Sequence, residues 1–171
     1  VRSGSQRLPN KWALPIAGIP ALGLLIHRYL FCRDVRNPRF WSSLEHEFVI
    51  CTSLSDDDDM IAEYAIHLGV ECFRGDMHSV AMRLTTAAEV YECDYVMRLT
   101  GDNPLVDFCL IEDLINYNKG AKFDYSAIKN LPIGVSGEIF SVGLLRKIVS
   151  ATNHSPQASE YLTFFVLANP G

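Results

Sequence analysis

Hydrophobic residues along the chain form two alternating patterns, short continuous apolar runs and longer segments with helical spacing. The run at 47–52 is typical of a buried strand, and segment 57–68 places Met60, Ile61 and Tyr64 on one face of a helix. The same patterns predict further strands at 70–73, 94–99, 123–128 and 138–142, and further helices at 77–91, 107–118, 142–152 and 156–167.

Strands that alternate with helices through short connections indicate an α/β fold with a parallel or mostly parallel sheet covered by helices. Ligands of such sheets bind beyond the carboxyl ends of the strands. Thr52 and Ser53 end one predicted strand, and Thr100-Gly101-Asp102 follows another. We therefore expect these two segments to form one binding crevice.

The first eleven residues have no strand or helix periodicity but concentrate cations, hydroxyls and a glycine. Such a segment can surround a polyphosphate, because glycine lets backbone N–H groups approach the anion while Arg and Lys neutralise its charge. A frayed basic terminus is the competing interpretation. The candidate phosphate-binding residues are Arg2, Ser3, Gly4, Ser5, Arg7 and Lys11.

Asp102 is the candidate metal ligand. An apolar strand followed by Gly101-Asp102 would project a carboxylate into the crevice, and Mg²⁺ uses one or two carboxylates together with substrate phosphates. The alternative for Asp102 is a turn residue. Asp107 is interpreted as a helix N-cap, and residues 56–59 as a solvated, acidic helix N-terminus.

The composition argues against two classes of protein, nucleic-acid-binding proteins and membrane-spanning proteins, and it indicates the compartment. The 171 residues carry a formal net charge of −5, which argues against general nucleic-acid binding. The longest uncharged stretch, 12–26, contains two prolines and two glycines and is too short to span a bilayer. Five cysteines without a C-x-x-C pair favour buried, reduced thiols, so we expect a cytoplasmic protein.

The opening Arg-Ser-Gly-Ser-Gln-Arg-Leu-Pro-Asn-Lys resembles the basic loop of sugar-acid cytidylyltransferases. The likeness is greatest to the group of the spore coat polysaccharide biosynthesis protein F and its CMP-KDO synthetase homologues. It continues in order through nearly the whole chain, at 50–53, 61–63, 68–70, 73–76, 98–107, 131–132 and 134–140.

The resemblance implies a Rossmann-like nucleotide-diphospho-sugar transferase fold of the glycosyltransferase A type, a three-layer sandwich. It also implies transfer of CMP from CTP to an acidic sugar with release of pyrophosphate, with Mg²⁺ as cofactor. By position, Arg2 and Lys11 would act on the triphosphate with Ser5 and Arg7, and Asp102 would bind Mg²⁺ beside the α-phosphate. The other implied substrate-binding residues are Ser3, Gly4, Thr52, Ser53, Arg74, Arg98 and Glu138. For Arg74 and Arg98, a structural ion pair is the alternative, and for Glu138 an exposed strand position.

Four departures from the family pattern bear on these expectations. Asn10 stands where the family has Gly, and Asn tolerates a left-handed backbone. Ser136 stands where an Asp could supply a second metal carboxylate, unless Glu138 replaces it. Residues 1–171 would form a single domain that lacks the family's first strand and C-terminal part. A non-catalytic nucleotide- or sugar-binding module, or a glycosyltransferase that uses a nucleotide-sugar, is the alternative, and a homodimer is possible.

Overall fold

The computed structural model describes residues 1–4, 8–44, 48–152 and 162–168. Its strands are β1 (Pro15–Ile16), β2 (Ile19–Pro20), β3 (Val49–Ser53), β4 (Glu71–Gly75), β5 (Tyr95–Arg98), β6 (Tyr125–Ala127) and β7 (Glu138–Ser141). Its α-helices are α1 (Ala21–Phe31), α2 (Pro38–Ser42), α3 (Asp59–His67), α4 (Val80–Val90), α5 (Phe108–Ala121), α6 (Val142–Thr152) and α8 (Leu162–Ala168). Short 3₁₀ helices η1 (Lys11–Ala13) and η3 (Asp56–Asp58) and a π-helical turn η2 (Cys32–Arg36) complete the described elements.

The strands form mixed rather than mostly parallel ladders. β3 pairs with β4 in parallel, whereas β7 lies between β5 and β6 and is antiparallel to both. The expectation of a mostly parallel sheet came from helix-containing connections, but residues 128–137 join β6 to β7 without a helix. Such a short connection allows the chain to turn back beside its own strand, which gives an antiparallel pair.

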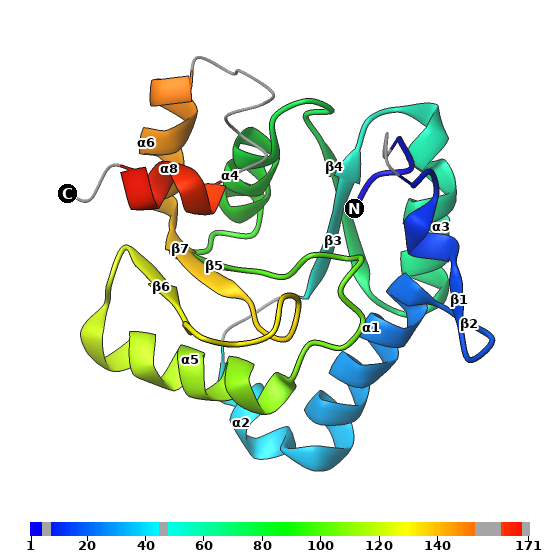
Figure 1. Cartoon of the computed structure of the whole chain (residues 1–171), viewed down its shortest axis with the longest axis horizontal. Helices are drawn as coiled ribbons and strands as arrows, with labels where there is room; N and C mark the ends of the chain where they lie inside the picture. The colour runs from blue at the N-terminus through cyan, green and yellow to red at the C-terminus, as the bar shows by residue number, and fades with distance from the viewer. Residues whose placement is uncertain (5–7, 45–47, 153–161, 169–171) are drawn as a thin grey trace.

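Helices cover the strands in two layers, which makes the molecule a three-layer α/β/α structure (Figure 1). On one side α1 and α3 pack on β3 through Leu22, Ile26, Ile50 and Ile61, and α5 continues that layer with α2. The other side is formed by α4, α6 and α8, which enclose the fully buried Phe140 of β7. The fold class predicted from the sequence is therefore confirmed.

Helix α1 and the β1–β2 hairpin were not predicted, because the prolines and glycines of 12–26 read as interruptions. Pro20 instead occupies the N-cap position, directly before the first helical residue. Gly23 lies inside the helix at a close contact, since a Cβ there would come 2.2 Å from the Tyr64 hydroxyl oxygen. The hairpin turns at Ala17 and Gly18, which both have positive φ.

Most other predicted elements are present with shifted ends. Helix α4 begins at Val80 rather than near residue 77, because Ser79 is its N-cap and accepts a hydrogen bond from the Met82 N–H. Asp107 caps α5 as expected and accepts from the Cys109 N–H at 2.8 Å. Met60 does not join the buried face of α3, because its side chain is 67% exposed. The predicted helix 156–167 lies partly outside the described residues.

The five cysteines are all free thiols, but only one of them is buried as expected. Cys32 is buried, Cys51, Cys72 and Cys93 are half-buried, and Cys109 is exposed. In the described parts of the chain, no helix is both long enough and apolar enough to cross a membrane.

Candidate functional site

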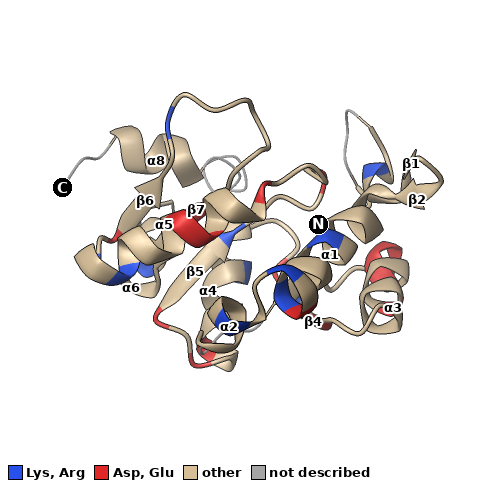
Figure 2. Ribbon diagram, turned by 90° about the horizontal axis from the view of Figure 1, so that it is seen from below, with Lys and Arg blue, Asp and Glu red and all other residues tan. Residues whose placement is uncertain are grey.

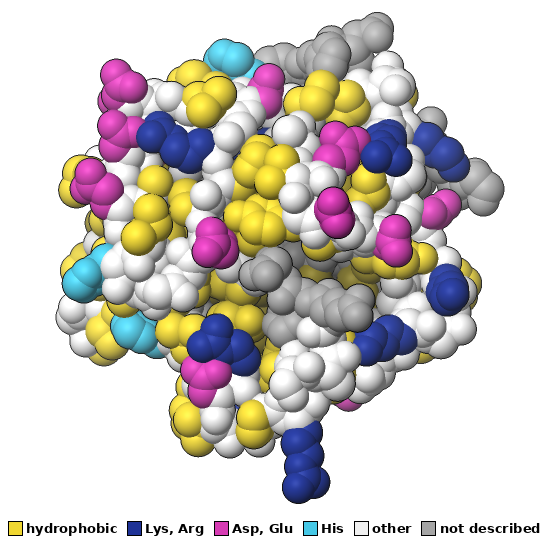
Figure 3. All heavy atoms as spheres, turned by 180° about the vertical axis from the view of Figure 1, so that it is seen from behind, with side chains coloured by type: hydrophobic (Ala, Val, Ile, Leu, Met, Phe, Trp, Pro, Cys, Tyr) yellow, Lys and Arg dark blue, Asp and Glu magenta, His cyan; other side chains and the backbone are white. Residues whose placement is uncertain are grey.

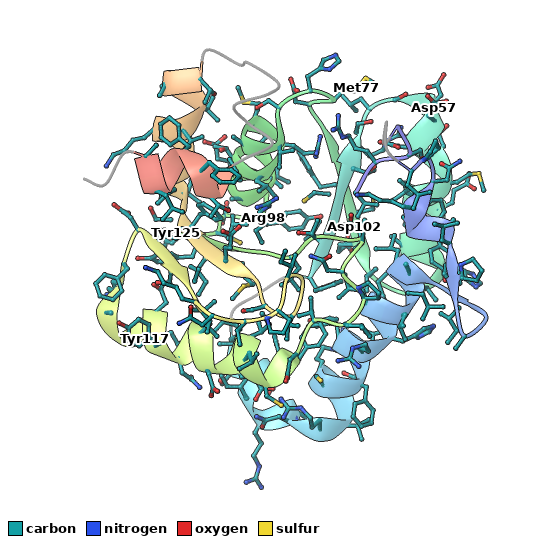
Figure 4. The ribbon with its side chains drawn as sticks, viewed as in Figure 1. Asp57, Met77, Arg98, Asp102, Tyr117 and Tyr125 are labelled. Atoms are coloured by element: carbon teal, nitrogen blue, oxygen red, sulfur yellow. The ribbon has the colours of Figure 1, made fainter. Side chains whose placement is uncertain are left out.

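A cavity of about 1830 Å³ lies between β3 and β5, and its lining includes buried core side chains such as Leu25, Tyr29 and Phe108. Ile50 and Cys51 line it from β3, and Met97 and Leu99 line it from β5 and the residue after it. Its wall also includes five of the predicted site residues, Arg2, Gly4, Lys11, Arg98 and Asp102. In Figure 4, Arg98 and Asp102 lie in the middle of the molecule, whereas Asp57 lies at its rim.

Lys11 and Asp102 are 91 positions apart in the sequence but form an ion pair at this cavity. Both side chains are half-buried, so the pair is accessible to a ligand. Lys11 begins η1 directly after Asn10, whose φ of 52° is left-handed. The interpretation that Asn10 tolerates the backbone geometry of the family's glycine is therefore supported.

The backbone before Asp102 is held in a close contact. Gly101 is buried against the side chain of Val1, and a Cβ at this glycine would lie 2.0 Å from Val1 Cγ2. Val1 N also donates to the Cys51 carbonyl at 2.8 Å. The first residue thus lies between the end of β3 and the loop after β5, and it brings the Arg2 segment to Asp102.

Besides Arg98, the guanidinium groups of Arg2 and Arg83 lie at the same cavity. Arg2 donates to the Met77 carbonyl at 2.7 Å, and Arg83 of α4 donates to the Asp76 carbonyl. Arg83 is only 4% exposed, and its burial together with the nearby Arg2 cation lowers the pKa of its guanidinium. Sequence reasoning missed Arg83; the available signal was an arginine within the predicted helix 77–91.

Ser3, Thr52 and Ser53 are buried beside the cavity rather than exposed in it. All three donate hydrogen bonds to the carboxylate of Asp58, which is 2% exposed. Residues 56–59 were interpreted as a solvated acidic helix start, and Figure 2 does show acidic residues at the start of α3. For Asp58 that interpretation is wrong, because the chain closes over it with the Ser3 backbone.

Arg74 stabilises the turn that follows β3. Its Nε donates to the Ser53 carbonyl at 3.0 Å, a terminal nitrogen donates to the Ser55 carbonyl at 2.8 Å, and it forms an ion pair with Asp59. It is not among the residues that line the cavity. These contacts favour the structural ion pair over a place in the substrate crevice.

Arg98 and Glu138 are joined across the β5–β7 ladder by an ion pair of 2.8 Å. The other carboxylate oxygen of Glu138 accepts hydrogen bonds from the Tyr125 hydroxyl and from Thr163 of α8. Burial, and next the hydrogen bond to Glu138, raise the pKa of Tyr125. The structural alternative for Arg98 is therefore present, although Arg98 also lines the cavity.

In the described part of the chain, no cluster of three or more His, Cys, Asp or Glu side chains is arranged to hold a metal ion by itself. Ser136 donates weakly to the Gly137 carbonyl, at 3.4 Å, and Glu138 is engaged by three donors. Three carboxylates line the cavity: Asp102 is half-buried beside Lys11, and Glu92 and Asp94 are exposed. The predicted site residues Ser5 and Arg7 lie outside the described residues.

On the face of the molecule seen in Figure 3, acidic and basic side chains are interspersed with apolar ones and do not gather into a patch of one sign. Of the amino-terminal cations, Arg2 and Lys11 line the cavity.

Comparison with known proteins gives a consistent result. The family model described as cytidylyltransferase matches residues 1–170. The chain is 32% identical over 169 residues to the spore coat polysaccharide biosynthesis protein SpsF of Bacillus subtilis, covering 99% of this chain and 68% of SpsF. It is 31% identical over 169 residues to the uncharacterized protein MJ1063 of Methanocaldococcus jannaschii, covering 99% of this chain and 65% of that protein.

Two solved structures share the fold. A cytidylyltransferase from Leptospira borgpetersenii serovar Hardjo-bovis superimposes with a TM-score of 0.81 at 31% identity, over 98% of this chain and 68% of that one. A CMP:2-keto-3-deoxy-manno-octonic acid synthetase, solved with CTP, has a TM-score of 0.69 at 17% identity, over 98% of this chain and 83% of that one. The chain thus spans about two thirds of the length of most of these relatives.

Proposed function

Because the chain belongs to the cytidylyltransferase family, we propose that it transfers CMP from CTP to an acidic sugar and releases pyrophosphate. The observation that carries the proposal is the accessible Lys11–Asp102 pair, which stands with Arg2 at one cavity. Nucleotidyl transfer needs positioning and charge neutralisation more than a covalent nucleophile, and this set of side chains supplies both.

In the proposed reaction a hydroxyl oxygen of the sugar forms a new bond to the α-phosphorus of CTP. The bond from that phosphorus to the β-phosphate oxygen breaks, pyrophosphate leaves, and the hydroxyl proton is released. Arg2 and Lys11 would hold the negatively charged phosphates, since both are cations at the cavity wall. Arg83, buried beside Arg2, would add to the positive potential.

Mg²⁺ fits Asp102, because Mg²⁺ in nucleotide sites takes one or two carboxylates and completes its coordination with phosphates and water. When bound, the ion would neutralise charge on the phosphate oxygens. The Lys11 ammonium now occupies the place beside this carboxylate. Lys11 would therefore exchange Asp102 for a phosphate when the nucleotide and the ion arrive.

The acidic class of acceptor rests on the relatives. One structural neighbour is named for 2-keto-3-deoxy-manno-octonic acid, and SpsF is named for spore coat polysaccharide biosynthesis. We accordingly propose a role in surface polysaccharide biosynthesis, in the cytoplasm where CTP is available. A homodimer remains a prediction.

The first experiment is thermal shift with CTP, ATP, GTP or UTP, each with and without Mg²⁺. Stabilisation by CTP that Mg²⁺ strengthens and that Asp102→Ala removes supports the proposal, with Asp57→Ala at the exposed rim as the matched control. Absence of a shift with every nucleotide would sink it. Release of pyrophosphate with a panel of sugar acids then tests the chemical step.

A non-catalytic binding module is the second candidate, and Ser136 is the observation that favours it. Ser136 has no carboxylate, and the carboxylate of Glu138 is already bound by Arg98 and Tyr125. Neither Ser136 nor Glu138 therefore offers a second carboxylate to a metal ion. Binding of CTP with no pyrophosphate release for any acceptor would select this candidate. Restoration of turnover by Ser136→Asp would support it further.

A further inference from the structure

Asp58 is a buried carboxylate whose two oxygens serve different parts of the chain. One oxygen accepts the backbone N–H of Ser3 at 2.7 Å. The other accepts the Thr52 hydroxyl at 2.9 Å, the Ser53 N–H at 3.1 Å and the Ser53 hydroxyl. Asp58 therefore joins the basic amino-terminal segment to the carboxyl end of β3.

Ser3 is in turn the base of that segment. Its carbonyl accepts the Asn10 N–H at 3.1 Å, which closes the loop between these two residues. Lys11 follows Asn10 directly, and Arg2 precedes Ser3. The positions of both cations at the cavity thus depend on where the Ser3 backbone is held.

The hydrogen bonds also account for how a charge is kept at this buried place. Burial alone would raise the pKa of Asp58, but hydrogen bonds from Ser53, Ser3 and Thr52 more than offset it and lower the pKa below its ordinary value. Within the described residues, none of the ion pairs includes Asp58. Loss of the carboxylate would leave several buried donors without an acceptor, which is costly.

We propose that Asp58 is a positioning residue for nucleotide binding, which acts through Ser3 to hold Arg2 and Lys11 at the spacing that a triphosphate requires. It does so without touching the nucleotide. The inference rests on the proposed function for the identity of the ligand, CTP.

Asp58→Asn separates the two halves of this junction. The amide has one oxygen, and it satisfies more donors when that oxygen faces Thr52 and Ser53. Its NH₂ group then faces the Ser3 N–H, donor against donor. The substitution thus breaks the link to the loop while it keeps the shape of the side chain.

The matched control is Asp57→Asn, the same change one position earlier at an exposed carboxylate (Figure 4). Three quantities are measured for both variants and the wild type: the KM and Kd for CTP with Mg²⁺, the KM for the acceptor sugar, and amide hydrogen exchange of residues 1–11. Hydrogen exchange needs no ligand.

We expect Asp58→Asn to raise the KM and Kd for CTP on the order of tenfold, since one charge-assisted hydrogen bond is lost. The KM for the acceptor stays unchanged, exchange in residues 1–11 rises, and Asp57→Asn behaves as the wild type. Unchanged CTP affinity overturns the inference. An equal rise in both KM values with faster exchange throughout the chain also overturns it, because that pattern belongs to general loosening.

Failure of the proposed function would give a different result from failure of this inference. If the wild type binds no nucleotide, that function fails, and hydrogen exchange alone decides whether Asp58 holds the segment. If Asp58→Asn does not fold, Ser53→Ala carries the test, because it removes a hydroxyl donor to the same carboxylate. Thr52 is less suitable, since its hydroxyl also donates to the Val1 carbonyl at 3.0 Å. We then expect a rise in the KM for CTP of roughly threefold, smaller because one of several donors is removed.

Discussion

Asp58 and Asp102 show how surroundings give one side-chain type two roles. Asp58 is enclosed and its oxygens are taken by the donors of Ser3, Thr52 and Ser53. Asp102 is half-buried at the cavity wall, where it pairs with the ammonium group of Lys11. The long Lys11 side chain can move this group away. A ligand can therefore compete with Lys11 for Asp102, whereas the Asp58 carboxylate binds only donors of the protein itself.

At the residue scale, Asp102→Asn should abolish most of the transfer activity. The variant keeps the shape but loses the charge that would hold Mg²⁺ and pair with Lys11, and removing one electrostatic group of this kind costs about 10²–10³-fold in kcat. Steady-state pyrophosphate release measures the effect. A kcat within about threefold of the wild type, well inside that range, would remove Asp102 from the site.

At the element scale, the β1–β2 hairpin contains a strained residue. Ala17 has a φ of 51° in the two-residue turn before Gly18, a conformation that costs an L-residue with a Cβ about 1–2 kcal/mol. Turns of this geometry favour Asn followed by Gly. The hairpin was missed in the sequence because Ala-Gly is a weak turn signal.

Ala17→Asn should therefore raise the free energy of unfolding by about 0.5–1 kcal/mol. Urea denaturation gives the change as a shift of the midpoint with the same m-value. Ala151→Asn, at an exposed position of α6 where the backbone is not left-handed, is the control and should not stabilise. A decrease for Ala17→Asn would show that the turn does not form as described.

Helix α4 depends on its cap in the same way. Ser79 is buried and accepts the Met82 N–H at 3.1 Å, while its own N–H donates to Asp76 at 2.6 Å. Ser79→Ala should lower the free energy of unfolding by about 1 kcal/mol, because a helix N–H loses its acceptor. The measurement is again urea denaturation, and Ser79→Thr, which retains a capping hydroxyl and adds no charge beside Asp76, should lose less. Equal losses for the two variants would contradict the capping role.

At the scale of the whole molecule, three carboxylates link stability to pH. Backbone hydrogen bonds from Ser79 and from Cys109 lower the pKa of Asp76 and of Asp107, and the pKa of Asp58 is also lowered. Between the folded and unfolded pKa values the unfolded state binds more protons, so stability rises with pH. The contribution is complete above the unfolded pKa of about 3.9 and is lost as pH falls through the folded values.

We therefore expect the urea midpoint to decline below about pH 5, and Asp58→Asn to decline less steeply than the wild type. Urea titrations from pH 3 to 7 test this, with Asp57→Asn as the control at an exposed position. Parallel acid limbs for the wild type and Asp58→Asn would show that Asp58 is not a linked group.

Local patterns alone determined much of this protein. Helix α6 was predicted with the bounds it has, and Asp107 was identified as a cap, because helical spacing and capping chemistry are contained within a few neighbouring residues. The ordered motifs likewise identified the family. Thr52-Ser53 and Thr100-Gly101-Asp102 were predicted to share a crevice because strand ends of an α/β sheet converge, and the family resemblance placed the basic segment beside Asp102.

Tertiary structure decided what depends on residues far apart in the chain. Within helix α1, position 23 has no room for a Cβ because the Tyr64 hydroxyl lies there, and no local signal reports that contact. Glu138 was predicted at the substrate but lies paired with Arg98, 40 positions away, and Asp58 is buried only because the Ser3 backbone folds over it. The sequence determined which side chains are present and which local elements they favour. Long-range packing decided their neighbours, since burial, pairing and pKa are properties of the environment and not of the residue.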